Sequence, residues 1–262
     1  MRAGLQKVVT FAGDVFHGNP AHVLTPPRLP GDEVMKQVVA LVGADVLAVI
    51  VGLDAEKPEL SFYTTGGPHP GAGHATHAAA HLALRQRDAL RFKLADGGER
   101  SVRRSGAGVS VDWPIMRYDS TSRAEEIAQA LGATPRSCLT STFGNIAIFS
   151  DEAEIARLTP DMARVSALDR VALIATAPGA TSDIVIRVFA PAVGLPEDPV
   201  CGTAHRIIIP YWAKQIGKTS IHSRHLSPRG GDLWCTLEEG MVVISGDCAD
   251  AFAGTLTFPD SV

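Results

Sequence analysis

The stretches Gly73-His74-Ala75 and Gly202-Thr203-Ala204 have the same form and stand about half a chain apart. Each follows an apolar, strand-like run and a polar loop, and each opens a stretch rich in alanine or isoleucine. This pattern predicts two helices that begin at a glycine after a buried strand. Because a helix N-terminus presents unpaired N–H groups and the positive end of a dipole, each start is suited to binding a carboxylate. We therefore expect a duplicated fold with one anion site between its halves.

The two halves also resemble each other ahead of these helices. The run Asp45-Val46-Leu47-Ala48-Val49-Ile50 parallels Asp169-Arg170-Val171-Ala172-Leu173-Ile174, and each precedes its glycine-led helix by a similar distance. Two similarities in the same order favour a structural repeat. We predict an α/β fold of two pseudo-symmetric halves, residues 1–117 and 118–262, in which the terminal strands can cross over.

Apolar residues fill the two predicted central helices on nearly every side. Ala78-Ala79-Ala80 lies in the first helix and Ile207-Ile208-Ile209 in the second. A helix that is apolar all round is a buried helix, so we expect a sheet wrapped around each.

Local signals place further elements. A capping-box spacing at Ser122 and Glu125 predicts a short helix after them. Two separate closing strands are expected near 242–245 and 254–258. Periodicity, glycine stops and the two glycine-led starts predict longer helices over these residues: 32–42, 73–87 and 202–215.

The composition is that of an ordinary globular protein, with 262 residues, 45% hydrophobic, 20% charged and a net charge of −4. The small net charge and the 6% aromatic content give no basic surface for nucleic acid or for an anionic membrane. The first residues lack the apolar core of a signal peptide, and the four cysteines lack CxxC spacing. We therefore expect a reduced, cytoplasmic protein.

Two short motifs imitate nucleotide-binding loops without completing them. Gly71-Ala72-Gly73-His74 lacks the third glycine of a dinucleotide fingerprint, and Gly217-Lys218-Thr219 lacks the upstream glycine of a P-loop. His74, His77 and His81 share a helical stripe, but the first and last are about 10 Å apart along the axis, too far to share one metal ion. We expect no cofactor and no metal, with His77 and His81 as interface or surface histidines.

Four side chains have the chemistry of proton transfer. His74 falls in a first helical turn, where it can donate a hydrogen bond or carry a proton; a simple helix cap is the alternative. Asp198 precedes a proline, a pair common in turns, but it also lies beside the second predicted anion site. Cys201 stands where a helix dipole favours its thiolate. Asp45 precedes a buried strand, a place typical of a turn residue.

These residues belong to a set of ordered motifs in which the chain resembles the PhzF family, the phenazine-biosynthesis isomerases and their relatives, over nearly its whole length. The motifs, with the family patterns they match, are Val15-Phe16-His17-Gly18-Asn19-Pro20-Ala21 (VFT-GNPA), Gly73-His74-Ala75-Thr76 (CGHAT), Arg187-Val188-Phe189-Ala190-Pro191 (RxFAP), Glu197-Asp198-Pro199-Val200-Cys201-Gly202-Thr203-Ala204 followed by Tyr211-Trp212 (EDPVTGSA, then YW), Arg229-Gly230-Gly231 and Gly254-Thr255-Leu256.

The resemblance implies a diaminopimelate-epimerase-like fold, in which each half is a curved, mostly antiparallel sheet round a central helix and the site lies in the cleft. It also implies a cofactor-free, metal-free isomerase of a small molecule, commonly a homodimer. In the family prototype a glutamate moves a proton between carbons of a cyclohexadiene amino acid, surrounded by a histidine, an aspartate and a serine. Carried onto this sequence, these residues are Asp45, His74, Asp198 and Thr203.

The same matching, together with the helix N–H groups, predicts the substrate contacts. They are Asn19, Gly73, Ala75, Gly202, Thr203 and His225.

The sequence departs from the family pattern at four places. Asp45 is one methylene shorter than glutamate, so its carboxylate reaches about 1.5 Å less far, which implies a smaller substrate or another role. Ala72 replaces a frequent cysteine, whereas Cys201 occupies the usual threonine position and resembles the second catalytic cysteine of related racemases. Because the side chain of Ala72 cannot take or give a proton, a two-cysteine racemase is disfavoured. His225 stands where relatives often carry glutamine, which suggests altered substrate contacts.

The favoured hypothesis is an isomerase that shifts a proton along an allylic or enamine system of a small carboxylated, amino-acid-derived metabolite in a biosynthetic pathway. Asp45, buried in the cleft, is the expected general acid/base, and His74 and Asp198 relay protons or bind polar groups. Two alternatives stay open. One is an epimerase or lyase centred on Cys201, and the other is a binding protein that has lost turnover on the same fold.

Overall fold

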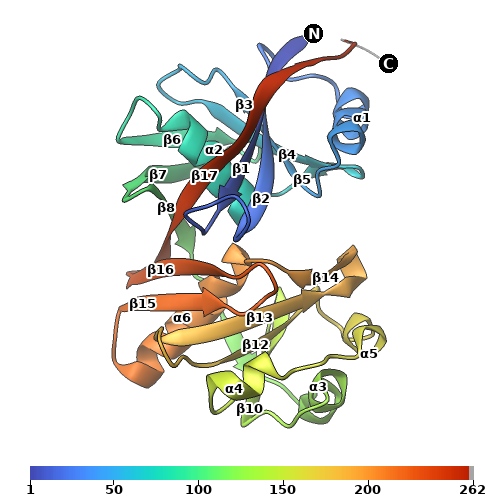
Figure 1. Ribbon diagram of the computed structural model, residues 1–262, viewed down its shortest axis with the longest axis vertical. Helices are drawn as coiled ribbons and strands as arrows, with labels where there is room; N and C mark the ends of the chain where they lie inside the picture. The colour runs from blue at the N-terminus through green and yellow to red at the C-terminus, as the bar shows by residue number, and fades with distance from the viewer. Residues whose placement is uncertain (260–262) are drawn as a thin grey trace. The chain divides into compact units, whose positions relative to one another are not determined.

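In the computed structural model, which describes residues 1–259, the chain passes between two units within β8 (Gly108–Pro114) and β17 (Met241–Thr257) (Figure 1). The first unit holds Met1–Asp112 and the residues from Ser245 onward, and the second holds Trp113–Ile244. The first boundary, after Asp112, lies five residues before the division predicted at 117/118, and the C-terminal strand is a terminal strand that crosses over. That strand belongs to the first unit because it pairs antiparallel with the first strand of the chain.

The sheet of the first unit is mostly antiparallel. β1 pairs antiparallel with both β17 and β2, β2 runs parallel to β3, and β3 is antiparallel to β4. β4 then pairs with β5 and β6, and the sheet continues through β7 to β8. The strands not yet given bounds are β1 (Arg2–Thr10), β2 (Asn19–Thr25), β3 (Leu47–Val51), β4 (Glu59–Thr64), β5 (Gly67–His69), β6 (Ala89–Leu94) and β7 (Glu99–Ser105).

Two helices cover opposite faces of this sheet. α1 (Asp32–Val42) has the predicted bounds and ends at a left-handed glycine; it packs on Leu47 and Val49, the alternate residues of β3. α2 (Gly73–Ala83) packs against β1, β2 and β3, and apart from His74 and His81 its residues are buried. The prediction of a buried helix is thus confirmed for α2.

α2 ends four residues earlier than predicted. The guanidinium of Arg104 donates hydrogen bonds to the carbonyl oxygens of Leu84, Arg85 and Arg87, at 2.9, 2.6 and 3.0 Å. An arginine from a neighbouring strand thereby satisfies carbonyls that a longer helix would have used internally.

The sheet of the second unit is also mostly antiparallel. β10 pairs with β9 and β11, β11 runs parallel to β12, and β12 is antiparallel to β13. β13 pairs antiparallel with β14 and parallel with β15, which is antiparallel to β16. Their bounds are β9 (Tyr118–Ser120), β10 (Ser137–Ser141), β11 (Gly144–Ile148), β12 (Ala172–Pro178), β13 (Ile184–Ala190), β14 (Leu195–Asp198), β15 (Ser220–His225) and β16 (Gly231–Glu238).

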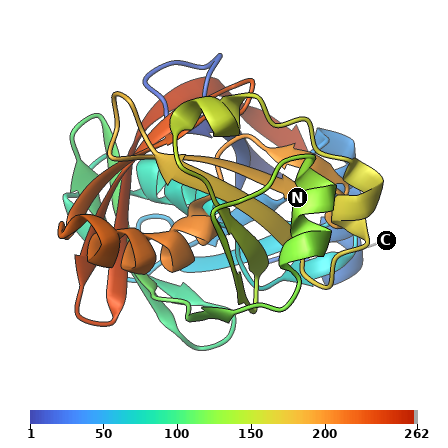
Figure 2. The same cartoon turned by 90° about the horizontal axis from the view of Figure 1, so that it is seen from below.

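Short helices cover one face of the second sheet and α6 (Gly202–Ile216) covers the other. The short helices bury Ile127 and Ile155 against Leu173 of β12, whereas Trp212 of α6 donates from its indole N–H to Thr176 Oγ1, which lies on the opposite face of that strand. Figure 2 shows the short helices in green and yellow and α6 in orange. The short elements are α3 (Ala124–Leu131), α4 (Glu152–Ala156), α5 (Met162–Ser166) and the 3-10 turn Pro191–Val193.

A proline interrupts the hydrogen bonds of α6 without ending the helix. Pro210 has no N–H to donate to the carbonyl of Arg206, and the backbone N–H of Met116 donates to that oxygen instead, at 3.0 Å. The side chain of Arg206 in turn donates to the carbonyl of Pro114, at 2.9 Å. The segment after β8 is thus fastened along α6. Neither α6, with its 15 residues, nor any other helix within 1–259 is long and apolar enough to cross a membrane.

Two local predictions are wrong. The capping box does not form: α3 has Arg123 at its N-cap, without a side-chain cap, and the hydroxyl that accepts the Arg123 N–H belongs to Thr121. The two closing strands expected near 242–245 and 254–258 are parts of β17, a single strand of 17 residues. A register shift opposite Lys7 and Val8 keeps the whole of β1 paired with β17, from Cys248 to Thr257.

Candidate active site

The first turn of α2 is open at its N-terminus. The N-cap residue Ala72 has the extended backbone typical of a cap, with φ −140° and ψ 135°, but no side chain that accepts a hydrogen bond. Its carbonyl accepts both the N–H and the hydroxyl of Thr76, at 2.9 and 2.8 Å. The backbone N–H groups at the start of the helix, from Gly73 to Ala75, therefore lack an acceptor from the N-cap side chain.

His74 lies in this turn and is half-buried. Burial, aided by the neighbouring rings of His77 and His69, lowers the pKa of His74 to about 4. Its imidazole is therefore neutral at pH 7, with one nitrogen able to donate and the other able to accept a hydrogen bond.

The other two histidines of the stripe have structural contacts. His77 is fully buried, faces the Gly73 carbonyl through Nδ1 at 2.8 Å, and packs on the ring of Phe11 with centroids 4.6 Å apart. The expectation of an interface or surface position is thus wrong for His77, which belongs to the core. His81 lies 3.5 Å from the carboxylate of Asp250.

The structure places Asp45 on the surface, so the expected burial of its carboxylate is wrong. Asp45 lies in the turn between α1 and β3, where its residue is exposed. The ionisable side chains beside it come from the neighbouring strands: His22 pairs in register with Lys7 on one side and with Leu47, two residues after Asp45, on the other. Burial and Lys7 lower the pKa of His22, and the Asp45 carboxylate opposes that shift. Asp45 thus acts on His22, whereas the ionisable groups that act on the pKa of His74 are His77 and His69.

Asn19 is buried at the first position of β2. Its carbonyl oxygen accepts the hydroxyl hydrogen bond of Thr10, at 3.0 Å, which closes the loop between β1 and β2. Gly18 before it has φ 72°, and a Cβ there would lie 2.3 Å from the Thr10 carbonyl oxygen. The GNPA motif therefore has a backbone role that requires glycine.

The second unit brings Asp198, Cys201 and Thr203 together at the start of α6. The Asp198 carboxylate accepts the N–H of Val200 at 3.1 Å and the hydrogen bond of the Cys201 thiol, while the N–H groups of Thr203 and Ala204 face the sulfur. Burial, followed by the charge of Asp198, raises the pKa of the Cys201 thiol well above its ordinary value. The thiolate predicted from the helix dipole is thus wrong, because desolvation and a neighbouring carboxylate outweigh the dipole.

Buried histidines hold the peptide groups of Cys201 on both sides. His225 Nε2 accepts the Cys201 N–H at 3.2 Å, and His205 Nδ1 lies 2.8 Å from the Cys201 carbonyl oxygen. His205 Nε2 lies 2.8 Å from the hydroxyl of Ser223. Sequence reasoning missed His205 and Ser223; the i, i+4 spacing of Cys201 and His205 was the available signal for the first. The predicted substrate contact His225 is only 1% exposed and bonds to the backbone.

An ion pair that sequence reasoning also missed joins two of the motifs. The Arg187 guanidinium binds both carboxylate oxygens of Glu197, at 2.7 and 2.9 Å, and donates to the carbonyls of Ile155 and Leu158. The same guanidinium lies over the ring of Phe189, 5.0 Å from its centroid. The arginine of one motif thus fixes the strand that carries Asp198.

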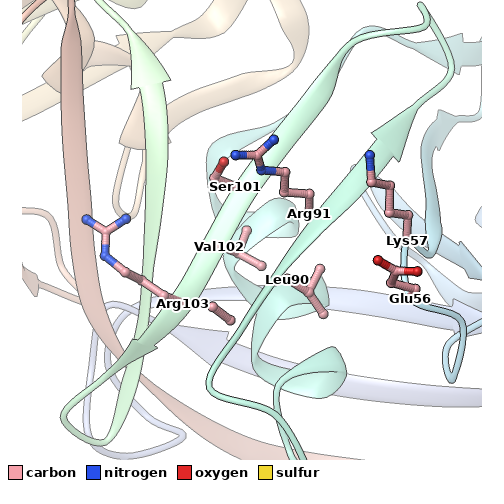
Figure 3. Close-up of a pocket in the computed structure, with 8 residues that line it drawn as sticks. Glu56, Lys57, Leu90, Arg91, Ser101, Val102 and Arg103 are labelled. Atoms are coloured by element: carbon pink, nitrogen blue, oxygen red, sulfur yellow. The ribbon is translucent and has the colours of Figure 1, made fainter.

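A surface pocket of about 480 Å³ in the first unit contains none of the predicted site residues (Figure 3). Its cations are already paired, with Lys57 and Arg91 on Glu99 and Arg103 on Asp112. Within residues 1–259, moreover, no three His, Cys, Asp or Glu side chains have an arrangement that could hold a metal ion. The helix starts therefore remain the candidate site.

Comparison with known proteins identifies the family. The family model described as phenazine biosynthesis-like protein, PhzC-PhzF, matches residues 8–254. The chain belongs to the PhzF family. Two uncharacterized isomerases of Pseudomonas aeruginosa are 33% and 34% identical to it over 260 residues, which is 98% of this chain and 99% of each relative. The crystal structure of a PhzF-family phenazine biosynthesis protein from Enterococcus faecalis superposes with a TM-score of 0.92 at 30% identity, covering 98% of this chain and all of the other.

The fold is therefore the α/β fold of the PhzF proteins and of the diaminopimelate-epimerase-like enzymes, as predicted. In this PhzF protein, several of the family motifs lie where the chain reaches α2 or α6. The RxFAP arginine and the EDPV glutamate form the Arg187–Glu197 ion pair, and the GHAT and GTA motifs form the first turns of α2 and α6.

Proposed function

We propose that this PhzF protein is a cofactor-independent isomerase that moves a proton along an allylic or enamine system of a small, carboxylated, amino-acid-derived metabolite in biosynthesis. In this proposal Asp45 is the general acid/base and the open N–H groups of the first turn of α2 bind the substrate carboxylate. His74 and Asp198 relay protons or bind polar groups of the substrate. The relatives that carry the word isomerase in their names support this class of reaction.

The observation that carries the proposal is the combination of His74 with the open turn of α2. A neutral imidazole can donate one hydrogen bond to developing negative charge and accept another without a change in net charge. The uncapped N–H groups next to it suit a carboxylate. The open turn can therefore bind the carboxylate of an amino-acid substrate, and the neutral His74 imidazole can exchange a proton beside it.

The proposed step keeps every atom of the substrate. Asp45 removes the proton on the α-carbon, and the double bond moves from Cβ=Cγ to Cα=Cβ. The same proton, or one exchanged with solvent, is then delivered to Cγ. The exposed position of Asp45 leaves its carboxylate accessible to a substrate.

The test is proton exchange in D₂O, followed by NMR, with two probes: vinylglycine (2-aminobut-3-enoate) and a cyclohexadiene amino acid. We expect deuterium at the γ-carbon of the product and a loss of about 10²–10⁴-fold in turnover for Asp45→Asn. Asp54→Asn changes an exposed carboxylate in the loop after β3; it is the matched control and should retain full turnover.

If Asp45→Asn keeps full turnover and Cys201→Ala abolishes it, Asp45 is not the base. Binding of both probes without exchange would instead favour a binding protein.

A second candidate function, an epimerase or lyase centred on Cys201, is favoured by the contact between its thiol and Asp198. The raised pKa makes this thiol a proton donor rather than a base, so Asp198 would have to accept the proton. An epimerase returns deuterium to the α-carbon with inverted configuration, and the double bond stays where it was. The site of labelling and the stereochemistry of the product therefore separate the two reactions.

A further inference from the structure

Two buried side chains hold one peptide residue at the start of α6. The N–H of Cys201 donates to His225 Nε2 at 3.2 Å, and its carbonyl oxygen lies 2.8 Å from His205 Nδ1. The two rings are 5.5 Å apart and tilted by 39°. Both histidines are almost completely buried, at 1% and 0% exposure, so neither is placed to touch a substrate directly.

We propose that His225 is a positioning residue, which with His205 sets the orientation of the Cys201 peptide and thereby of the thiol and of Asp198. The kinetic consequence rests on the proposed function, but the positioning itself does not. This role takes the place of the direct substrate contact that was predicted because His225 stands where relatives often carry glutamine.

The hydrogen-bond donors and acceptors determine the form of each ring. A backbone N–H can only donate, so His225 Nε2 has to carry a lone pair and the ring proton is on Nδ1. A carbonyl oxygen can only accept, so His205 has to carry a proton on Nδ1 as well, and its Nε2 then accepts from the Ser223 hydroxyl. The Cys201 peptide thus requires the Nδ1–H tautomer of both histidines.

Burial keeps the His225 ring neutral, and the bond from the Cys201 N–H then selects the tautomer, whose Nδ1 is buried without a hydrogen-bond partner within residues 1–259. Burial lowers the pKa of His225 well below the ordinary value, and the adjacent His205 lowers it further. Protonation of Nε2 would break the bond to the Cys201 N–H and leave that N–H without its acceptor in the interior. The contact therefore persists across the neutral pH range.

The same turn couples this peptide to the side chains that carry chemistry. Asp198 accepts the N–H of Val200, the residue before Cys201, and Ser227 donates its hydroxyl hydrogen to the Pro199 carbonyl at 2.6 Å. A rotation of the peptide at Cys201 moves the sulfur relative to the Asp198 carboxylate, because both are attached to the same tight turn. His225 acts on the reaction only through this turn.

Long-range ¹H–¹⁵N NMR of the histidine rings in the full-length protein tests the positioning without any substrate. We expect both His225 and His205 in the neutral Nδ1–H form, unchanged between pH 6 and pH 8. We also expect His225→Leu to shift the Cys201 amide resonance, and His225→Gln to restore most of that shift, since its Oε1 can accept the same N–H. An Nε2–H tautomer for His225, or its titration in this range, would overturn the inference.

Kinetics in the D₂O assay then test the consequence. We expect His225→Leu to lower kcat by about 10–100-fold with little change in KM, and His225→Gln to stay within about threefold. His222→Leu on the outer face of the same strand, where its ring stacks on the exposed Trp234, is the matched control. A normal kcat for His225→Leu with a shifted Cys201 amide would refute the catalytic consequence. Absence of turnover in the unaltered protein would count against the proposed function and leave the ring-tautomer result to decide this inference.

Discussion

The first turns of α2 and α6 begin with the same glycine-led motif but differ in their N-cap residue. Ala72 leaves the turn of α2 open, whereas the sulfur of Cys201 faces the N–H groups of the turn of α6. The residue four positions on bonds to the N-cap carbonyl in both cases, as Thr76 in α2 and as His205 in α6. The two helix starts thus have the same hydrogen bond to the N-cap carbonyl but differ in the side chain at the N-cap.

This difference shows how a repeated fold can separate two tasks. An open helix N-terminus offers its partial positive charge to a ligand, and a filled one uses that charge within the protein. In this chain the first arrangement accompanies a neutral histidine, and the second accompanies a protonated thiol beside a carboxylate. In the proposed function the open turn of α2 binds the substrate carboxylate, whereas the N–H groups of the α6 turn face the Cys201 sulfur within the second unit.

The contacts that hold the chain just before each helix also differ. Removing the contact before α6 should have the largest effect on stability. The chain approaches α2 through a loop in which the Gly71 N–H bonds to His69, but it approaches α6 through the Arg187–Glu197 pair, whose side chains are only 13% and 15% exposed. Arg187→Met leaves the Glu197 carboxylate buried without its cation. We expect a loss of about 3–5 kcal/mol in the free energy of unfolding of the second unit.

Urea unfolding followed by tryptophan fluorescence measures this loss, because the three tryptophans of the chain all lie within Trp113–Ile244. Arg224→Met on the exposed side of β15 is the control and should change the stability by less than about 0.5 kcal/mol. Equal effects of the two substitutions would show that the ion pair contributes nothing specific to the approach to α6.

The second prediction uses pH to separate the two turns. The pKa of His74 is lowered to about 4 in the folded state, so the unfolded chain binds more protons between about pH 6.5 and pH 4. The contribution of His74 to stability is therefore complete above pH 6.5 and decreases as the pH falls, by about 1–2 kcal/mol at pH 5. Cys201 has the opposite dependence: its raised pKa means that its contribution decreases only as the pH rises above 9.

Urea titrations at pH 7 and pH 5, followed by circular dichroism, compare the unaltered protein with His74→Gln. The glutamine variant should lose the part of the acid sensitivity that belongs to His74. An identical pH dependence in both proteins would mean that the His74 imidazole is not desolvated in the folded state.

The smallest expected effect comes from making the open turn resemble the filled one. Ala72→Ser adds a hydroxyl that can accept from the N–H groups of the first turn of α2, and the extended backbone of residue 72 already has N-cap geometry. We expect a gain of about 0.5–2 kcal/mol in the stability of the first unit, measured by urea unfolding, together with weaker binding of the carboxylated probes. Ala72→Gly, which adds no acceptor, is the control; tighter probe binding by Ala72→Ser would contradict the role of the open turn.

Much of the fold could be predicted from local sequence because local physics controls it. The bounds of α1 follow from its apolar periodicity and from the glycine that stops it, and α6 was predicted to within one residue from its glycine-led start and its apolar run. The places where prediction failed depend on distant partners. β17 continues through the predicted break because β1 pairs with it from Cys248 to Thr257. α2 stops early because Arg104 from another strand binds the carbonyls at its end.

The sequence by itself determined the family, the two glycine-led helix starts, and the residue types available for proton transfer. Only the tertiary structure decided the state of those residues. Burial and an adjacent carboxylate keep the Cys201 thiol protonated, and burial, aided by two neighbouring histidines, keeps His74 neutral. The position of Asp45 in a surface turn leaves it exposed. The reason is that a pKa and a hydrogen-bond role depend on the groups that folding brings within a few ångströms, and sequence spacing alone does not specify those neighbours.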